Sequence, residues 1–94
     1  MLLNNARLQA ELTKRITMAI IGIRSDYKWN IEAFEVILKR QFLVTSLWDQ
    51  YMAREMMDAG TNQEAAIFAT RLVKTVTGGD VTKLPLFKEV CATV

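Results

Sequence analysis

The side chains that could do chemistry in this chain are few, because the sequence contains no histidine and a single cysteine. Histidine is the usual general acid–base and metal-binding side chain at neutral pH, so carboxylates and lysines are the remaining candidates. Asp49 stands between Trp48 and Tyr51, and burial among such neighbours would raise its pKa. Asp49 also follows Ser46 by three residues, where a carboxylate complements the positive end of its own helix. We favour this second role.

The other reactive groups favour structural roles as well. Cys91 has no second cysteine to pair with and lies in an apolar stretch, so we expect it to pack as a small hydrophobic residue in a reducing compartment. Glu32 and Glu35 share one helix face but hold the positions of capping and surface acids. The Gly78-Gly79 pair lacks the lysine of a phosphate-binding loop. We therefore predict no catalytic residue, no cofactor and no metal site.

Aromatic and methionine side chains remain as candidates for binding another protein. Three methionines cluster on one expected helix, and methionine fills irregular cores as well as adaptable binding surfaces, so both roles stay open. Trp48 and Tyr51 have helical spacing, which favours core packing. Trp29 precedes a cap residue and favours a hydrophobic staple over a ligand contact. The candidate partner-binding residues are Met52, Met56, Met57 and Trp29.

Apolar periodicity predicts four well-marked helices and a fifth, weaker one that position these side chains. The first carries an apolar stripe from Leu8 to Ile23, is capped by Asn4 or Asn5, and breaks at residues 24–26. No segment alternates between apolar and polar residues as a half-buried strand would. The connections are short, so consecutive helices are expected to be antiparallel neighbours.

Cap residues mark the ends of the second and third helices. Asn30 is expected to cap the second helix, and Thr45 or Ser46 the third. Gly60 is expected to end the third helix in a left-handed conformation.

The ends of the last two helices are marked in the same way. Thr61 and Glu64 fit a capping box at the start of the fourth helix, and Gly78 stands at its end. Residues 80–84 are expected to form a loop, and Pro85 suits the first turn of the last helix.

Length and composition limit the architecture to one domain. The chain has 94 residues, of which 51% are apolar, and this predicts a single α-helical domain over residues 1–94. The fold class is all-α, a small antiparallel bundle of four to five helices. No apolar run approaches a membrane span, and no signal peptide is recognised, so a cytoplasmic or nuclear location is expected.

The basic residues indicate no concentrated nucleic-acid surface. The formal net charge is +2, and the only adjacent basic pairs are Lys14-Arg15 and Lys39-Arg40. A nucleic-acid-binding domain normally gathers its positive charge on one face. Solvated helix faces are therefore the favoured interpretation, and nucleic-acid binding is not expected.

Several short motifs follow one another in a distinctive order. They are Asp26-x-Lys28-Trp29-Asn30-x-Glu32-Ala33, Leu43-Val44, Asp49, Met57-Asp58-Ala59-Gly60, Phe68-Ala69-Thr70-Arg71-Leu72-Val73-Lys74 and Leu86-Phe87. Their order and spacing over residues 12–94 resemble a segment of the large scaffold subunit of the CCR–NOT deadenylase complex. That segment lies in the helical-repeat body just before the C-terminal Not module. The chain departs from the family in lacking histidines after the aspartate and in a shorter loop at 78–84.

The resemblance implies a HEAT/MIF4G-like helical-repeat segment that acts as a scaffold and not as an enzyme. Such a segment contacts other protein subunits or neighbouring repeats, and it holds deadenylase nucleases and regulatory subunits together. The complex thereby shortens messenger RNA poly(A) tails and represses translation. The resemblance also implies that these 94 residues are a fragment of a longer protein or a divergent short chain.

Two other readings stay open at this stage. The chain could be an unrelated small helical adaptor, for example viral or bacterial, that binds a protein through the apolar face of its methionine-rich third helix. It could also contact RNA through Lys14, Arg15, Lys39 and Arg40. If the methionines form an interface, Met56→Asp is expected to leave the helices intact and abolish partner binding.

Overall fold

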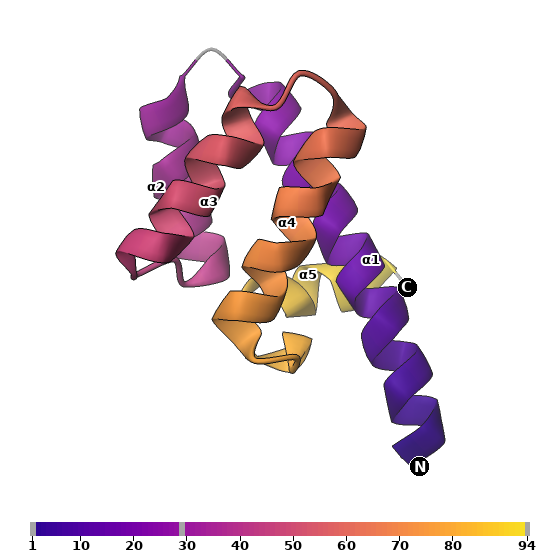
Figure 1. Cartoon of the computed structure of the whole chain (residues 1–94). Coiled ribbons are helices and arrows are strands. Elements are labelled where there is room, and N and C mark those ends of the chain that lie inside the picture. The colour runs from indigo at the N-terminus through magenta and orange to yellow at the C-terminus, as the bar shows by residue number, and fades with distance from the viewer. Residues whose placement is uncertain (1, 29, 94) are drawn as a thin grey trace.

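The computed structural model describes the backbone of residues 2–28 and 30–93, and within these ranges the chain is almost entirely helical. The elements are α1 (Leu2–Asp26), α2 (Ile31–Phe42), α3 (Leu47–Asp58), α4 (Asn62–Thr77), the short 3₁₀ helix η1 (Val81–Lys83) and α5 (Leu86–Thr93). The predicted all-α fold with five α-helices is therefore confirmed for the described residues. The helices fit within about 42 × 23 × 21 Å, with the first turns of α1 projecting past the others (Figure 1).

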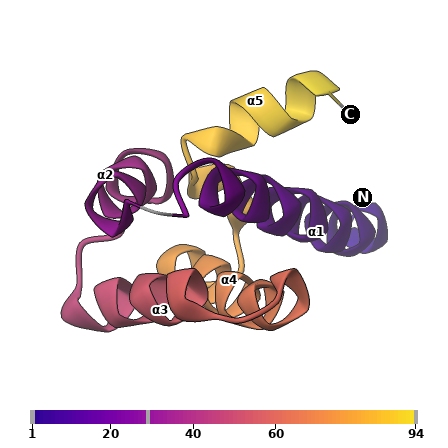
Figure 2. The ribbon, with the colours of Figure 1, turned by 90° about the horizontal axis from the view of Figure 1, so that it is seen from above.

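The helices form two layers (Figure 2). Helices α3 and α4 lie side by side in one layer and form the most closely packed pair, whereas α1, α2 and α5 lie across from them. The main neighbours of α1 are α4 and α5, and α2 packs against α3. The expectation that α1 and α2 would pack as consecutive neighbours is therefore wrong. The contact between α1 and α4 instead joins segments far apart in the sequence.

One core joins the two layers. The α1 stripe at Leu12, Ile16 and Ile20 is buried as predicted, although Leu8 and Met18 are exposed. Small buried residues on α4 permit close packing of helices. The fully buried large side chains are Leu12, Ile16, Ile20, Phe34, Leu38, Phe42, Met56, Leu72, Val73, Thr77 and Val81.

Three predicted N-caps are confirmed. The side-chain oxygens of Asn30, Ser46 and Thr61 each accept a hydrogen bond of 3.1 Å from the backbone N–H three residues later. The Glu64 carboxylate closes the last of these caps by accepting a 3.1 Å hydrogen bond from the Gly60 backbone N–H. These bonds satisfy donors that a helix start leaves unpaired, and each is typically worth about 1 kcal/mol.

Other predicted helix ends differ from the structure. Helix α1 begins at Leu2 and continues through residues 24–26, so Asn4 and Asn5 are internal to the helix and no break occurs at 24–26. Gly60 does not adopt a left-handed conformation. Leu43 does, with φ 55°, at the end of α2. The short connection to α3 imposes this turn without a glycine to favour it.

The region after α4 is partly as predicted. Gly78 ends α4 in a left-handed conformation with φ 63°, as expected, and its backbone N–H donates to the Lys74 carbonyl oxygen. Residues 81–83, expected in a loop, form η1. Asp80 caps this turn by accepting a 3.1 Å hydrogen bond from the Thr82 backbone N–H.

Candidate protein-interaction surfaces

The methionine cluster of α3 faces the core. Met52, Met56 and Met57 are all buried, and Met56 has 0% of its surface exposed. Helix α3 turns this face inward, where it belongs to the same hydrophobic cluster as residues of α1, α2 and α4. Of the two roles left open by the sequence, the structure places these side chains in the core. The predicted partner contact is corrected accordingly, because a buried side chain reaches a partner only if the core opens.

The opposite face of α3 presents three large apolar side chains to solvent. Leu47, Trp48 and Tyr51 are 83%, 58% and 57% exposed, and together they line a shallow surface hollow. The rings of Trp48 and Tyr51 stack, with centroids 6.2 Å apart and planes inclined by 19°. The prediction that Trp48 and Tyr51 pack in the core is therefore wrong. We call Leu47, Trp48 and Tyr51 the α3 aromatic patch.

The polar end of the patch is held by Glu55, one turn further along α3. A hydrogen bond from the Tyr51 hydroxyl to Glu55, together with the negative charge of that carboxylate, raises the pKa of Tyr51 above its usual value. The hydroxyl therefore keeps its proton at neutral pH and acts as a donor. The Tyr51 ring is oriented by stacking on Trp48.

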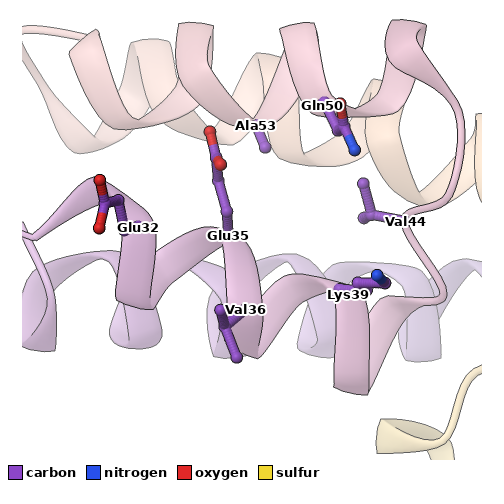
Figure 3. Close-up of a pocket in the computed structure, with 7 residues that line it drawn as sticks. All are labelled: Glu32, Glu35, Val36, Lys39, Val44, Gln50 and Ala53. Atoms are coloured by element: carbon purple, nitrogen blue, oxygen red, sulfur yellow. The ribbon is translucent and has the colours of Figure 1, made fainter.

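A groove lies between α2 and α3, with lining residues from both helices (Figure 3). Its volume is about 250 Å³, which is below the usual size of a pocket for a small metabolite. Leu47 and Gln50 stand three residues apart on α3, so the patch borders the groove. The groove is lined by Glu32, Glu35, Val36 and Lys39 of α2, the linker residue Val44, and Gln50 and Ala53 of α3.

An ion pair ties the two walls of this groove together. The Arg54 guanidinium of α3 lies 3.0 Å from the Glu35 carboxylate of α2. Figure 3 shows Glu35 pointing from α2 toward α3, with Ala53 opposite. The sequence had suggested Glu35 as a surface or capping acid; its placement against another helix was not foreseen.

A second polar tie fixes the end of α3. Arg24, near the end of α1, donates to the Met56 carbonyl oxygen at 2.8 Å, to the Ala59 carbonyl oxygen, and to Asn62 Oδ1 at 2.9 Å. The last carbonyls of a helix have no partner within the helix, so a guanidinium satisfies them and complements the negative end of the helix dipole. We call this arrangement the Arg24 clamp. Sequence reasoning missed it because its partners, two backbone carbonyls and one side-chain amide, are more than thirty residues away.

The remaining reactive candidates are accounted for by their positions. Asp49 is buried in the first turn of α3, the position in which its carboxylate was expected to complement the helix end. Cys91 is exposed, so the expectation that it packs as a hydrophobic residue is wrong. Val90 takes the inward position of α5 instead. Trp29 lies outside the described residues, and its suggested roles stay predictions.

The described residues form no group of three or more histidine, cysteine, aspartate or glutamate side chains able to hold a metal ion. In the described part of the chain, the helices instead expose several large apolar side chains to solvent. None of the described helices has both the length and the hydropathy that crossing a membrane requires.

Comparison with known proteins identifies the family to which this helical arrangement belongs. The Cnot1 ARM repeat family matches residues 2–91, almost the whole chain. The chain belongs to the Cnot1 ARM repeat family. It is also 47% identical over 88 residues to the CCR4-NOT transcription complex subunit let-711 of Caenorhabditis elegans. No solved structure matches the chain.

The match covers 94% of this chain but only 3% of the worm protein, so this Cnot1 ARM repeat spans a small part of the length of that relative. The resemblance to the CCR–NOT scaffold and the helical-repeat fold are thereby confirmed. The alternative of an unrelated viral or bacterial adaptor is excluded by membership of the family. In this repeat the methionines of α3 are buried in the core, whereas the α3 aromatic patch and the adjoining groove lie on the surface.

Proposed function

We propose that this Cnot1 ARM repeat is a non-enzymatic scaffold segment of a CCR4–NOT complex and binds another protein subunit or a neighbouring repeat. The observation that carries the proposal is the 47% identity to a worm subunit of that complex over nearly the whole chain. The surface chemistry supports it, because the α3 aromatic patch exposes a tryptophan and a tyrosine side by side. These residue types dominate the binding energy of protein interfaces.

Within the complex, the segment would help to hold deadenylase nucleases and regulatory subunits together. Its contribution to shortening poly(A) tails and repressing translation is then indirect, through the position of its partners. This work would take place in the cytoplasm, and also in the nucleus if the complex assembles there.

RNA contact is a weaker candidate function. The two basic pairs lie on different helices, α1 and α2, which are not principal packing neighbours. Arg15 is moreover engaged by Glu11 at 3.1 Å. Charge divided in this way does not form the continuous basic face that nucleic acid prefers.

The proposal is tested by expressing the tagged chain in eukaryotic cells and identifying the captured proteins by mass spectrometry. We expect CCR4–NOT subunits to be enriched over a tag-only control. The double variant Trp48→Ala, Tyr51→Ala should lose this enrichment if the α3 aromatic patch is the contact. Ile67→Ala is the matched control, because Ile67 is an exposed apolar residue on α4 that does not line the patch or the groove.

The outcomes separate the parts of the proposal. Enrichment that survives in the double variant would support the scaffold and overturn the assignment of the patch. No enrichment of any subunit of the complex, by a chain whose folding is confirmed by circular dichroism, would overturn the scaffold role itself.

A further inference from the structure

A second surface, away from the α3 aromatic patch, runs along the contact between α1 and α4. The depression there has a volume of about 480 Å³ and is bordered by residues of both helices. Small side chains, alanine and threonine, make up most of its lining. The lining residues are Ala10, Thr13, Lys14, Thr17, Met18, Ala66, Thr70 and Lys74. We call it the α1–α4 groove.

Met18 lies at the edge of this groove. Its side chain is 60% exposed, and it also borders a second depression of about 490 Å³ that α1 shares with α5. Lys14 borders both depressions as well. Because methionine is flexible and unbranched, it adapts its shape to an apolar surface placed against it.

A buried hydroxyl beneath the α1–α4 groove has no hydrogen-bond partner. Thr17 is only 6% exposed, and its Oγ1 neither donates nor accepts a hydrogen bond within the described part of the chain. Threonines on α4 behave differently: Thr70 donates to the Ala66 carbonyl oxygen at 2.8 Å, and Thr77 to that of Val73 at 2.6 Å. An unpaired buried polar group lowers stability, so its presence in a native fold needs an explanation. One explanation is that a ligand group forms a hydrogen bond with the Thr17 hydroxyl in the bound state.

The charge of the α1–α4 groove is positive. Lys14 on α1 and Lys74 on α4 are both exposed at its edges, and none of the described lining residues is acidic. In the adjoining depression Glu11 is paired with Arg15 at 3.1 Å, so it does not offset Lys14 strongly. The groove therefore attracts a ligand with carboxylates on the side that faces the lysines.

We propose that the α1–α4 groove binds an acidic amphipathic helix of a partner protein. Small lining residues let the backbone of a helix approach closely, Met18 contacts its apolar stripe, and its carboxylates pair with Lys14 and Lys74. The Thr17 hydroxyl, brought to the groove by rotation about χ1, hydrogen-bonds a polar group of the incoming helix. This proposal concerns a different surface from the α3 aromatic patch and does not depend on the scaffold role.

A protein helix fits the groove better than RNA does. Two lysines supply few of the phosphate contacts on which nucleic-acid affinity depends. The described lining includes no aromatic side chain on which a base could stack, and it exposes an apolar methionine at its rim. An amphipathic helix laid into an apolar groove is, by contrast, a recurring mode of peptide recognition.

The test uses the isotope-labelled full chain titrated by NMR with three probes. The first is a helical alanine–leucine peptide of about 15 residues with glutamates on its polar face. The second has lysine in place of each glutamate, and the third is a single-stranded RNA of mixed sequence. We expect the acidic peptide to shift amide signals of residues 10–18 and 66–74, with the lysine peptide and RNA binding at least about tenfold more weakly.

Variants sharpen the result. Lys14→Glu with Lys74→Glu should weaken acidic-peptide binding about tenfold, whereas Lys39→Glu with Arg40→Glu, the matched change on α2, should leave it unaltered. Ala66→Met should fill the groove and block binding with an unchanged circular dichroism spectrum. Tighter binding of RNA than of the acidic peptide, shifts confined to α3, or no shifts with any probe would each overturn the proposal.

Discussion

The two faces of α3 carry apolar residues with opposite surroundings. On the inner face, Met52 and Met56 pack into the core, and the backbone at the end of this face is held by Arg24. On the outer face, Leu47, Trp48 and Tyr51 remain in solvent. The inner face is held by core packing and by the Arg24 hydrogen bonds, whereas more than half of each outer side chain is exposed. The difference separates residues that stabilise the fold from residues available for binding.

The comparison also shows which residue types serve each purpose. Flexible methionines fill the space between α3 and its neighbours, where their shape adapts to an irregular interior. The rigid rings of Trp48 and Tyr51 stack on each other and are oriented before any partner arrives. Because little freedom is left for a partner to remove, such a pair binds with a small entropic cost. The outer face is therefore suited to recognition.

The largest effect is expected from placing a charge on the inner face. Met56→Asp buries a carboxylate with no partner at a fully enclosed position, which should cost more than about 4 kcal/mol and unfold a domain of this size. Circular dichroism and urea denaturation measure this loss. The structure thus reverses the expectation that helix content would survive the change.

Trp48→Asp provides the matched control, because it introduces the same carboxylate on the outer face of the same helix. Its unfolding midpoint should stay close to that of the parent chain. If both variants unfold to the same extent, the distinction between the two faces of α3 does not hold.

The next effect concerns the Arg24 clamp, which ties the end of the inner face to α1. Arg24→Ala removes hydrogen bonds to two carbonyl oxygens and to Asn62, and we expect a loss of about 2 kcal/mol in the free energy of unfolding. Arg71→Ala, at an exposed arginine of α4, should change it by less than about 0.5 kcal/mol. Denaturant titration of the two variants checks both values, and equal losses would show that the clamp is not a stabilising feature.

The sequence predicted the parts of this fold that depend on neighbouring residues. The caps at Asn30, Ser46 and Thr61 were predicted because a cap joins residues three positions apart. The stripe of α1 was predicted from its helical period, and the resemblance to the CCR–NOT scaffold from the order of short motifs. The caps and the stripe depend on residues a few positions apart, and the resemblance depends on the order of motifs in the sequence.

The errors arise where tertiary packing decides which side chains are buried and which partners they contact. Helical spacing does not distinguish the two apolar faces of α3. The role of the methionines was therefore left open between core and interface, and the Trp48–Tyr51 pair was wrongly placed in the core. The Arg24 clamp leaves no pattern, because any sequence supplies backbone carbonyls. Gly60 was expected from propensity to form a left-handed turn after α3 and does not, whereas Leu43, at the end of α2, adopts a left-handed turn that propensity did not indicate.

That left-handed turn gives a smaller prediction. Leu43 has φ 55° at the corner that leads into α3, and a branched side chain there is strained. Leu43→Gly should raise the free energy of unfolding by up to about 1 kcal/mol, because glycine adopts this conformation without a steric cost. Thermal denaturation measures the change. Leu47→Gly is the control, since glycine within the first turn of α3 should instead lower stability; a loss of similar size in both variants would argue against strain at Leu43.

The buried hydroxyl of Thr17 can be compared with the outer face of α3, because the hydroxyl lacks a hydrogen-bond partner in the described part of the chain and the outer side chains are more than half exposed. Thr17→Val keeps the shape of the side chain and removes the unpaired hydroxyl, so the free chain should gain about 0.5–1 kcal/mol. The same change at Thr77, whose hydroxyl is bonded to the Val73 carbonyl oxygen, should lower stability. A loss at both positions would mean that Thr17 has a partner in solution.

Only a small effect on stability is expected from changes on the outer face of α3. The double variant Trp48→Ala, Tyr51→Ala removes two large rings that are more than half exposed, so the free energy of unfolding should change by less than about 1 kcal/mol. Partner capture should nevertheless be lost, because the rings supply the apolar surface of the patch. A variant with wild-type stability and no partner binding would separate the two faces of α3 by function, whereas a loss near that of Arg24→Ala would place the rings among the residues that hold the fold.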